Sequence, residues 1–499
     1  MSKKPSTTIS RPADQQQSLF IQFQDADGVT TGAPISIPAS TTPAQLEALL
    51  HQLLPKNKGG EEDEQPLPYN FSIHDTEILT TLYQDIVVGG KISTREGILP
   101  IVYRPQAVFR VRAVSRCTST LAGHQDAILC VSFSPDGRRL VSGSGDNCVR
   151  FWDLDTETPL KVSSGGHTGW VLCLAWSPDG KYLASGGMDG TVCIWEGQGP
   201  AVGTLKGKLL GHRQWITALA WEPLHLVAGG GTLSPPRLAS SSKDGTAKVW
   251  DVIRRNCALT LSQHTDAVSC IRWGGDGTIY TGSRDRTIRM WYPADGRLKG
   301  QLSGHAHWVN SLALSTDHVL RTGAFDHRGE IATPEDPQAA AKVRYETALK
   351  ACDGVERLIS ASDDFTLFLW EPAKSSKPVA RLTGHQALVN HVAFSPDGRY
   401  LASVAFDKSV KLWDGRKGTF LSSLRGHVGR VYQVAWSADS RLLMTSSQDS
   451  TLKVWDVRTR HLKQDLPGHL DEVYAVDWSP IGDRGASGGK DKMLKLWRQ

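Results

Sequence analysis

The sequence predicts an all-β propeller of eight blades behind a small N-terminal α+β domain. The first observation is a repeat: after residue 120 a His, a turn Asp and a Trp recur eight times, mostly at intervals of 41 to 45 residues, and Gly precedes the His in seven of the copies. The second is composition, because 16 Trp and 48 Gly in 499 residues suit many short strands joined by tight turns. Repeats of this length are typical of propellers, in which each repeat supplies most of a four-stranded blade.

Each repeat carries four residue types at fixed spacing. The Asp precedes the Trp by six residues in all eight copies. A His, an Asp, a strand Ser or Thr and a Trp suit a buried hydrogen-bonded chain in which the Asp orients the imidazole and the indole packs as an anchor. We therefore interpret these residues as structural, and the first and sixth copies supply His124, Asp146 and Trp152, and His385, Asp407 and Trp413.

The same residue types also make up the Ser-His-Asp triad of hydrolases. A nucleophile needs one activated and accessible site, whereas eight equivalent copies indicate a scaffold. The sequence contains no H-E-x-x-H motif, no P-loop and no Cys/His ligand cluster. We expect a protein that is not an enzyme and has no cofactor of its own.

Three repeats depart from the pattern. The fourth reads Ser262-Gln263-His264, and the third carries an extra loop from Val227 to Pro236. The fifth contains two candidate second strands, Leu320 to Asp326 and Arg357 to Asp364. A ninth, degenerate blade is one interpretation, but we favour eight blades with an insertion over about 327 to 354, which has no Gly-His pair and no Trp and includes an Ala/Lys/Glu-rich helical piece.

The ends of the repeat region predict how the propeller closes. Trp497 ends the third strand of the last blade, and that blade lacks an outer strand after it. Residues Ala113 to Leu121, just before the first Gly-His pair, have the character of the missing strand. We expect N- and C-terminal segments to share one blade, which removes the open sheet edges.

Residues 106 to 499 resemble the WD-repeat family, and this resemblance implies partner contacts on the top rim of the propeller. The rim is formed by the loop after each Gly-His pair and by the residue before each turn Asp. Aromatic and Arg side chains are preferred interface anchors. The candidate partner-binding residues are Trp170, Trp215, Trp308 and Arg430 after the His, and Lys243, Arg284, Phe406 and Lys490 before the Asp.

The N-terminal region predicts a polar, disordered tail over residues 1–17 and a folded domain over residues 18–105. Strands are expected at Leu19–Phe23, Pro34–Ile37, Tyr69–Ile73 and Ile98–Tyr103. Thr42 as N-cap, Pro43 at the first helical position and Gln45 begin a helix, whose apolar stripe consists of Leu46, Leu49, Leu50, Leu53 and Leu54. The order β-β-α-β-β suggests a ubiquitin-like fold.

Composition favours a soluble cytosolic or nuclear protein. We find no apolar run long enough for a membrane span and no apolar signal core after Met1. The eight Cys include no C-x-x-C pair, and we interpret them as reduced packing residues. The first 105 residues hold 8 Lys/Arg against 12 Asp/Glu, which leaves 48 against 39 in the rest, a basic balance compatible with a nucleic-acid-rich environment.

The whole arrangement is similar to the Notchless family of large-ribosomal-subunit assembly factors. The segments that carry the resemblance are the junction Tyr103–Cys117, Gly304–Asn310 and Ser362–Trp370, together with the N-terminal domain and the eight repeats. The resemblance implies residence in the nucleolus and nucleus, and docking as a monomer on large-subunit precursors with their assembly factors, ribosomal proteins and rRNA. It also implies that midasin, an AAA+ ATPase, grips the ubiquitin-like domain to remove the factor.

In that family an acidic loop residue of the ubiquitin-like domain completes the coordination of a divalent metal held by midasin. The matching position is Glu96, in the loop Ser93–Gly97. A carboxylate suits Mg²⁺, so the resemblance implies a shared Mg²⁺ at the partner interface. The alternative for the whole chain is a signalling or ubiquitin-pathway adaptor, including a modulator of Notch signalling, whose propeller recruits substrates.

Overall fold

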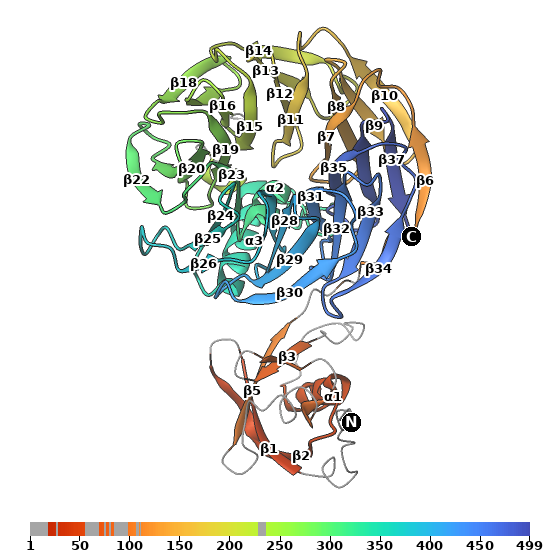
Figure 1. The fold of residues 1–499 in the computed structure, drawn as a ribbon. Coiled ribbons are helices and arrows are strands. Elements are labelled where there is room, and N and C mark those ends of the chain that lie inside the picture. The colour runs from red at the N-terminus through yellow and green to blue at the C-terminus, as the bar shows by residue number, and fades with distance from the viewer. Residues whose placement is uncertain are drawn as a thin grey trace, which may run out of the picture. The chain divides into compact units, whose positions relative to one another are not determined.

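The computed structural model describes residues 18–25, 28–54, 69–73, 76–78, 81–83, 98–105, 109, 111–227 and 236–499. The chain divides into two compact units, Met1–Arg110 and Val111–Gln499. Each unit is described by itself. Figure 1 labels the helices and strands of both.

The described residues of the first unit include a five-stranded sheet and a helix. Its strands are β1 (Ser18–Gln24), β2 (Thr30–Pro38), β3 (Tyr69–Ile73), β4 (Thr76–Glu77) and β5 (Leu99–Pro105), and its helix is α1 (Pro43–Leu53). The sheet order is β2-β1-β5-β3-β4, in which β1 and β5 are parallel and the other neighbours antiparallel. The expected strands and helix are present, and β2 is longer than predicted.

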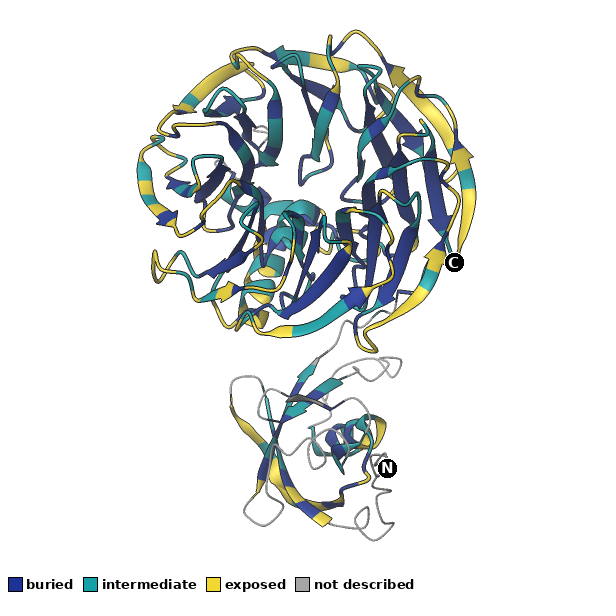
Figure 2. Cartoon of the chain, viewed as in Figure 1, coloured by how far each residue is buried: buried dark blue, intermediate teal, exposed yellow. Residues whose placement is uncertain are grey.

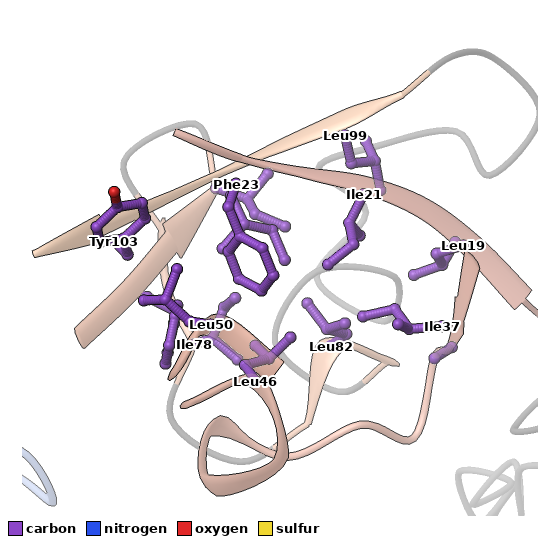
Figure 3. Packing of buried hydrophobic residues seen from close by; sticks show 14 residues of the cluster. Leu19, Ile21, Phe23, Ile37, Leu46, Leu50, Ile78, Leu82, Leu99 and Tyr103 are labelled. Carbon is purple, nitrogen blue, oxygen red and sulfur yellow. The ribbon is translucent and has the colours of Figure 1, made fainter. Parts of the chain in front are cut away.

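Helix α1 begins where the capping pattern places it. The backbone N–H of Thr42 donates to Oε1 of Gln45 at 2.9 Å, and Pro43 occupies the first turn. Leu46 and Leu50 of the predicted stripe are fully buried, and the other three leucines pack partly buried against the same core. Figure 3 shows Leu46 and Leu50 facing Phe23 and Ile21 of the sheet.

The described residues of the second unit form eight four-stranded antiparallel sheets, numbered first to eighth in chain order. The first strands of neighbouring sheets pack against one another, and β35 packs against β7, so the sheets form a closed ring (Figure 1). These inner strands are β7 (Ile128–Phe133), β11 (Val171–Trp176), β15 (Ile216–Trp221), β19 (Val268–Trp273), β23 (Val309–Leu314), β27 (Val389–Phe394), β31 (Val431–Trp436) and β35 (Val473–Trp478).

The remaining strands follow outward in each sheet. The second strands are β8 (Arg139–Ser144), β12 (Tyr182–Gly187), β16 (Leu238–Ser242), β20 (Ile279–Ser283), β24 (Leu358–Ser362), β28 (Tyr400–Ala405), β32 (Leu442–Ser447) and β36 (Gly485–Gly489). The third are β9 (Val149–Asp153), β13 (Val192–Glu196), β17 (Ala247–Asp251), β21 (Thr287–Trp291), β25 (Leu367–Trp370), β29 (Ser409–Asp414), β33 (Leu452–Asp456) and β37 (Leu494–Arg498). The outermost are β10 (Thr158–Ser163), β14 (Leu205–Leu209), β18 (Asn256–Leu261), β22 (Leu298–Ser303), β26 (Ala380–Leu382), β30 (Phe420–Arg425), β34 (His461–Leu466) and β6 (Arg116–Leu121).

Burial is greatest in the second and third strands of each sheet, which lie between the inner and the outermost strands. Figure 2 shows buried and half-buried residues along the inner strands and many exposed residues along the outermost strands. The fourth strand of the eighth sheet is β6, which pairs antiparallel with β37 through Arg116↔Arg498 to Leu121↔Leu494. The prediction that segments from the two ends of the repeat region share one sheet is confirmed.

The segment between β23 and β24 contains two helices, α2 (Asp317–Thr322) and α3 (Pro337–Ala351). The insertion therefore begins about ten residues earlier than predicted. Leu320 to Asp326 is the segment predicted as the alternative second strand. Its first three residues lie in α2, and the rest form a turn with one isolated bridge from Phe325 to Ile331, so the interpretation of that segment as a strand is wrong. β24 supplies the second strand of the fifth sheet instead.

Helix α2 lines a cavity of about 370 Å³ together with residues of the inner strands. Arg321 donates through Nη1 to Oδ1 of Asp477 in the eighth sheet at 2.9 Å and through Nη2 to the carbonyl oxygen of Phe133 in the first sheet at 3.2 Å. Nε of Arg272 in the fourth sheet lies 3.4 Å from Oδ2 of Asp317. The insertion thus contacts inner strands of the first, fourth and eighth sheets, which are distant in sequence. Helix α3 packs on both α2 and the short helix η3 (Leu224–Leu226).

The eight Cys are free thiols. Cys193, Cys270 and Cys352 are buried, as expected of packing residues, but Cys117 and Cys257 are exposed because they lie on the outermost strands β6 and β18. None of the helices in the described ranges is long and apolar enough to cross a membrane.

The exit of α2 gives a test of the insertion. Gly323 adopts φ 57°, and a Cβ added there would lie 2.4 Å from the carbonyl oxygen of Pro178. We expect Gly323→Ala to lower the free energy of unfolding by about 3 kcal/mol, because left-handed strain and a backbone clash combine. The matched control is Gly354→Ala, where φ is 71° but no atom lies within 4 Å of the added Cβ, so only about 1 kcal/mol of strain is expected. Equal denaturant midpoints for the two variants would contradict this packing of α2.

Candidate functional site

The sixth sheet shows the geometry of the predicted structural residues. Nδ1 of His385 lies 2.8 Å from Oδ2 of Asp407, and Nε2 of His385 lies 2.8 Å from Oγ of Ser403. Nε1 of Trp413 donates to the same Ser403 Oγ at 2.8 Å. The four side chains form one hydrogen-bonded chain from the indole to the carboxylate.

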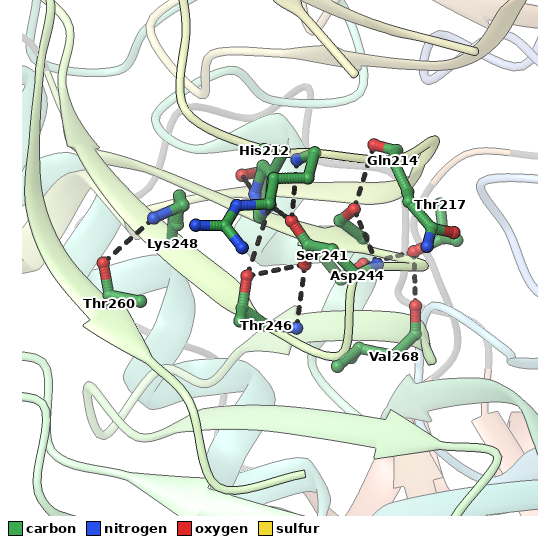
Figure 4. A network of polar contacts seen from close by, with 12 residues as sticks. His212, Gln214, Thr217, Ser241, Asp244, Thr246, Lys248, Thr260 and Val268 are labelled. Carbon is green, nitrogen blue, oxygen red and sulfur yellow. Dashed lines mark hydrogen bonds and ion pairs between the residues drawn. The ribbon is translucent and has the colours of Figure 1, made fainter. Parts of the chain in front are cut away.

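The chain of contacts recurs in all eight sheets. The distance from His Nδ1 to the Asp carboxylate is 2.7–3.3 Å, that from His Nε2 to the Ser or Thr hydroxyl 2.7–2.8 Å, and that from Trp Nε1 to this hydroxyl 2.7–3.0 Å. In the first sheet it joins His124, Asp146 and Trp152 through Ser142. Figure 4 shows the copy in the third sheet, around His212 and Asp244.

The protonation of the chain follows from its partners. Burial would raise the pKa of Asp407, but hydrogen bonds from His385 and from the backbone outweigh it and hold this pKa well below its usual range. Burial lowers the pKa of His385. A neutral imidazole then donates a hydrogen bond from Nδ1–H to the carboxylate and accepts one at Nε2 from the Ser403 hydroxyl. Ser403 is fully buried and also accepts the Trp413 N–H, so no substrate reaches its oxygen.

Each turn Asp also holds the backbone of two rim segments, the loop after the His and its own turn. Asp407 accepts from the backbone N–H of Gln386, the residue after His385, at 3.0 Å, and from the backbone N–H of Ser409 at 3.0 Å. The loop after the Gly-His pair is thereby held against the turn that contains the Asp. Consequently, the residue before each Asp lies beside the loop after a His.

The structure brings six of the eight candidate partner-binding residues together as cation–aromatic pairs. Nζ of Lys243 lies 3.4 Å from the ring centroid of Trp215, within the third sheet. Cζ of Arg284 in the fourth sheet lies 4.2 Å from the ring of Trp308 in the fifth. The third pair is Arg430 over Phe406, at 5.1 Å, between the seventh and sixth sheets.

The two other candidates lie apart from these pairs. Trp170 is 49% exposed. Lys490 is exposed and forms an ion pair with Asp471 at 3.5 Å. Of the paired rings, Trp308 is 38% exposed and Trp215 is half-buried.

One aromatic cluster was not predicted. Tyr432 packs against Phe406 with ring centroids 5.8 Å apart and against Tyr474 at 5.4 Å, and its hydroxyl donates to Oε2 of Glu472 at 2.7 Å. Both tyrosines occupy the bulge position of an inner strand, directly after Val431 and Val473. A Tyr immediately after the first strand Val is the signal that sequence analysis missed.

No three His, Cys, Asp or Glu side chains among the described residues are grouped as a metal site. Glu96 lies outside the described residues, between Tyr83 and the strand β5 that starts at Leu99.

The network predicts the effect of removing one turn carboxylate. We expect Asp407→Ala to lower the free energy of unfolding by about 1–3 kcal/mol, because Nδ1 of the buried His385 loses its acceptor. The control is Asp155→Ala, which removes a carboxylate that is 80% exposed and lies 3.9 Å from Arg484, and it should cost less than about 1 kcal/mol. Thermal and denaturant unfolding measure both. An Asp407→Ala protein as stable as wild type would exclude the network as a source of stability.

Comparison with known proteins assigns both units to described families. A family model described as "WD domain, G-beta repeat" matches residues 115–153, 158–196, 203–251, 255–292, 376–414, 418–456 and 460–498. These matches leave out the fifth repeat, which carries the insertion. A second model, "NLE (NUC135) domain", matches residues 19–86.

Curated relatives match most of the chain. "Ribosome assembly protein 4" of Saccharomyces cerevisiae is 52% identical over 422 residues, which cover 81% of this chain and 79% of the relative. "Notchless protein homolog" of Arabidopsis thaliana is 53% identical and covers 82% of each chain, and "Protein Notchless" of Drosophila melanogaster is 49% identical over 74% of this chain and 73% of the relative.

Among solved structures, the computationally designed Ika8 protein matches with a TM-score of 0.58 and 25% identity, over 77% of this chain and all of that one. Identity of about one half over four fifths of the chain goes beyond a shared fold. The chain therefore belongs to the family of Notchless and ribosome assembly protein 4, whose members are non-catalytic WD-repeat scaffolds.

Proposed function

We propose that this protein is an assembly factor of the large ribosomal subunit that docks on precursor particles and serves as the handle by which midasin removes it. The observation that carries the proposal is the 52% identity to ribosome assembly protein 4 across 81% of the chain. In this proposal the eight sheets are the blades of one WD-repeat propeller, and the first unit is a ubiquitin-like docking domain. The protein acts in the nucleolus and nucleus as a monomer within the particle.

The rim built by the turn Asp residues supports a docking role for the second unit. It carries exposed or half-buried aromatic rings with cations stacked on them, and such residues dominate the binding energy of protein interfaces. The hydrogen-bonded chain beneath fixes their backbone, so little conformational entropy is lost on binding. Sedimentation of the endogenous protein with precursor particles tests the proposal, since an adaptor outside ribosome assembly remains in light fractions.

The docking surface itself can be tested by truncation of three rim residues. We expect Trp215→Ala, Trp308→Ala and Arg430→Ala together to abolish association with precursor particles, because single interface anchors contribute about 2 kcal/mol or more. The three side chains are exposed or half-buried, so the variant should keep its fold. A folded triple variant that sediments with precursor particles like wild type would exclude this face as the docking surface.

We also propose that Glu96 provides a carboxylate oxygen to a Mg²⁺ ion held by midasin. Support comes from the family resemblance and from its position ahead of β5, and no other side chain between Ser93 and Gly97 is anionic. The ion would supply a strong, directional bond between the two proteins, which is the chemistry expected of a pulling contact.

Two substitutions of Glu96 test this contact in the full-length protein. Glu96→Ala should abolish Mg²⁺-dependent midasin binding, and Glu96→Asp should weaken it because the shorter side chain misses a coordination distance of about 2.1 Å. Docking of the second unit on precursors should be unaffected, so the expected cellular result is dominant accumulation of particles with the variant still bound. Equal midasin affinity of wild type and Glu96→Ala, or indifference to chelator, would exclude Glu96.

A further inference from the structure

Lys243 and Arg284 form a pair of cations on the rim of the third and fourth sheets. Lys243 follows β16 and lies over Trp215, and Arg284 follows β20 and lies over Trp308. Burial and the nearby positive charge of Arg284 lower the pKa of Lys243. Two like charges are thus held near each other in a partly desolvated place.

Neither cation has an acidic partner in the part of the chain that the structure describes. The carboxylates on the same arc are already bound within the protein. Asp244 and Asp285 accept from the network histidines, and Asp266 accepts from the backbone N–H of Ala267 at 2.6 Å. Asp363 accepts from Nδ2 of Asn310 at 2.5 Å and lies 3.6 Å from Nδ1 of His307.

Lys490 of the eighth sheet differs from these two cations, because it is paired with Asp471 at 3.5 Å. Arg430 of the seventh sheet lies over Phe406 and, among the described residues, has no acidic partner either. Lys243 and Arg284 differ from Arg430 because they are two cations on adjoining sheets, near enough for the charge of Arg284 to act on Lys243. One acidic group of a partner can therefore meet both charges.

We propose that Lys243 and Arg284, with Trp215 and Trp308 beneath them, bind an acidic side chain of a partner protein segment in which that residue is flanked by apolar ones. A carboxylate between the two cations would accept charge-assisted hydrogen bonds from both. The exposed part of Trp308 provides apolar surface for the flanking residues. The inference rests on the proposed function, because it assigns a partner chemistry to part of the proposed docking face.

A protein segment is favoured over RNA by the state of the two Trp rings. Base stacking needs open aromatic faces, but one face of Trp215 and one face of Trp308 are covered by the cations. A carboxylate side chain binds the cations themselves and needs no open ring face.

Fluorescence anisotropy with the full-length protein tests the site. The probe is a short labelled peptide in which Glu alternates with Gly and Leu, and the comparison probes are the same peptide with Gln in place of Glu and an oligouridylate of equal charge. Wild type should bind the Glu peptide about tenfold or more tightly than the Gln peptide, as expected for charge-assisted hydrogen bonds. The double variant Lys243→Ala and Arg284→Ala should lose this preference. The control Lys408→Ala removes an exposed cation of the sixth sheet and should bind like wild type.

Salt dependence gives a second measurement that needs no variant. Affinity for the Glu peptide should fall with added salt, whereas affinity for the Gln peptide should change little. Equal affinity of wild type and the double variant for the Glu peptide would overturn the proposal, and so would tighter binding of the oligouridylate than of the Glu peptide.

Sedimentation with precursor particles separates this inference from the proposed function. A wild-type protein that binds the Glu peptide but never sediments with precursors supports the site and refutes the role in ribosome assembly. A wild-type protein that sediments with precursors but shows no preference for the Glu peptide refutes the acidic-segment site and supports that role.

Discussion

The turn carboxylate of each sheet is the group on which the rest of the second unit depends. It accepts from an imidazole, from the backbone after the Gly-His pair and from its own turn, so one side chain joins two loops and the strands below them. The imidazole is hydrogen-bonded to a buried hydroxyl of the second strand, and this hydroxyl accepts from the indole N–H of the third strand. Because the side chains of the network hydrogen-bond one another, these bonds offset the cost of removing their polar groups from water.

Cohesion between sheets has a separate origin. Each inner strand carries a bulge after its first residue. In the third and sixth sheets, the side chain of the bulged residue reaches the next sheet. Thr217 donates to the carbonyl oxygen of Val268 at 2.7 Å, and Asn390 donates to that of Tyr432 at 2.6 Å. A bulge frees one residue from the ladder, so its side chain can cross to the neighbouring strand.

Three further contacts hold the place where the first and last sheets of the ring meet. β6 completes the eighth sheet, and before it the backbone N–H of Val111 donates to the buried carboxylate of Asp439 in the seventh sheet at 2.8 Å. Arg321 of the insertion binds Asp477 of the eighth sheet from inside. A force applied to the chain before Val111 therefore acts first on the buried hydrogen bond to Asp439. Without this bond, the force would act directly on the β6–β37 pairing, whose hydrogen bonds would break one by one.

Sequence alone predicted the elements that periodic spacing encodes, and it missed those that depend on distant contacts. The six-residue interval between Asp and Trp identified the network, since a two-residue strand period and a tight turn leave little freedom. Helix α2 was mistaken for a candidate strand, because Arg321 finds its acceptor Asp477 at a separation of 156 residues. The rim residues were predicted, but their pairing was not. Arg284 of the fourth sheet lies over Trp308 of the fifth, and no local sequence pattern encodes how neighbouring sheets are placed against each other.

The network and the rim are two consequences of the same turn. In Lys243-Asp244 and Arg284-Asp285 the carboxylate points inward to a histidine, which commits its negative charge to the fold. The cation immediately before it points to the rim and cannot pair with that carboxylate without breaking the chain beneath. A cation at this position therefore remains unmatched unless another acidic residue lies nearby, as Asp471 does for Lys490. In the third, fourth and eighth sheets, where this residue is Lys or Arg, its positive charge thus stays on the rim. The neighbouring residues decide whether the protein or a partner neutralises it.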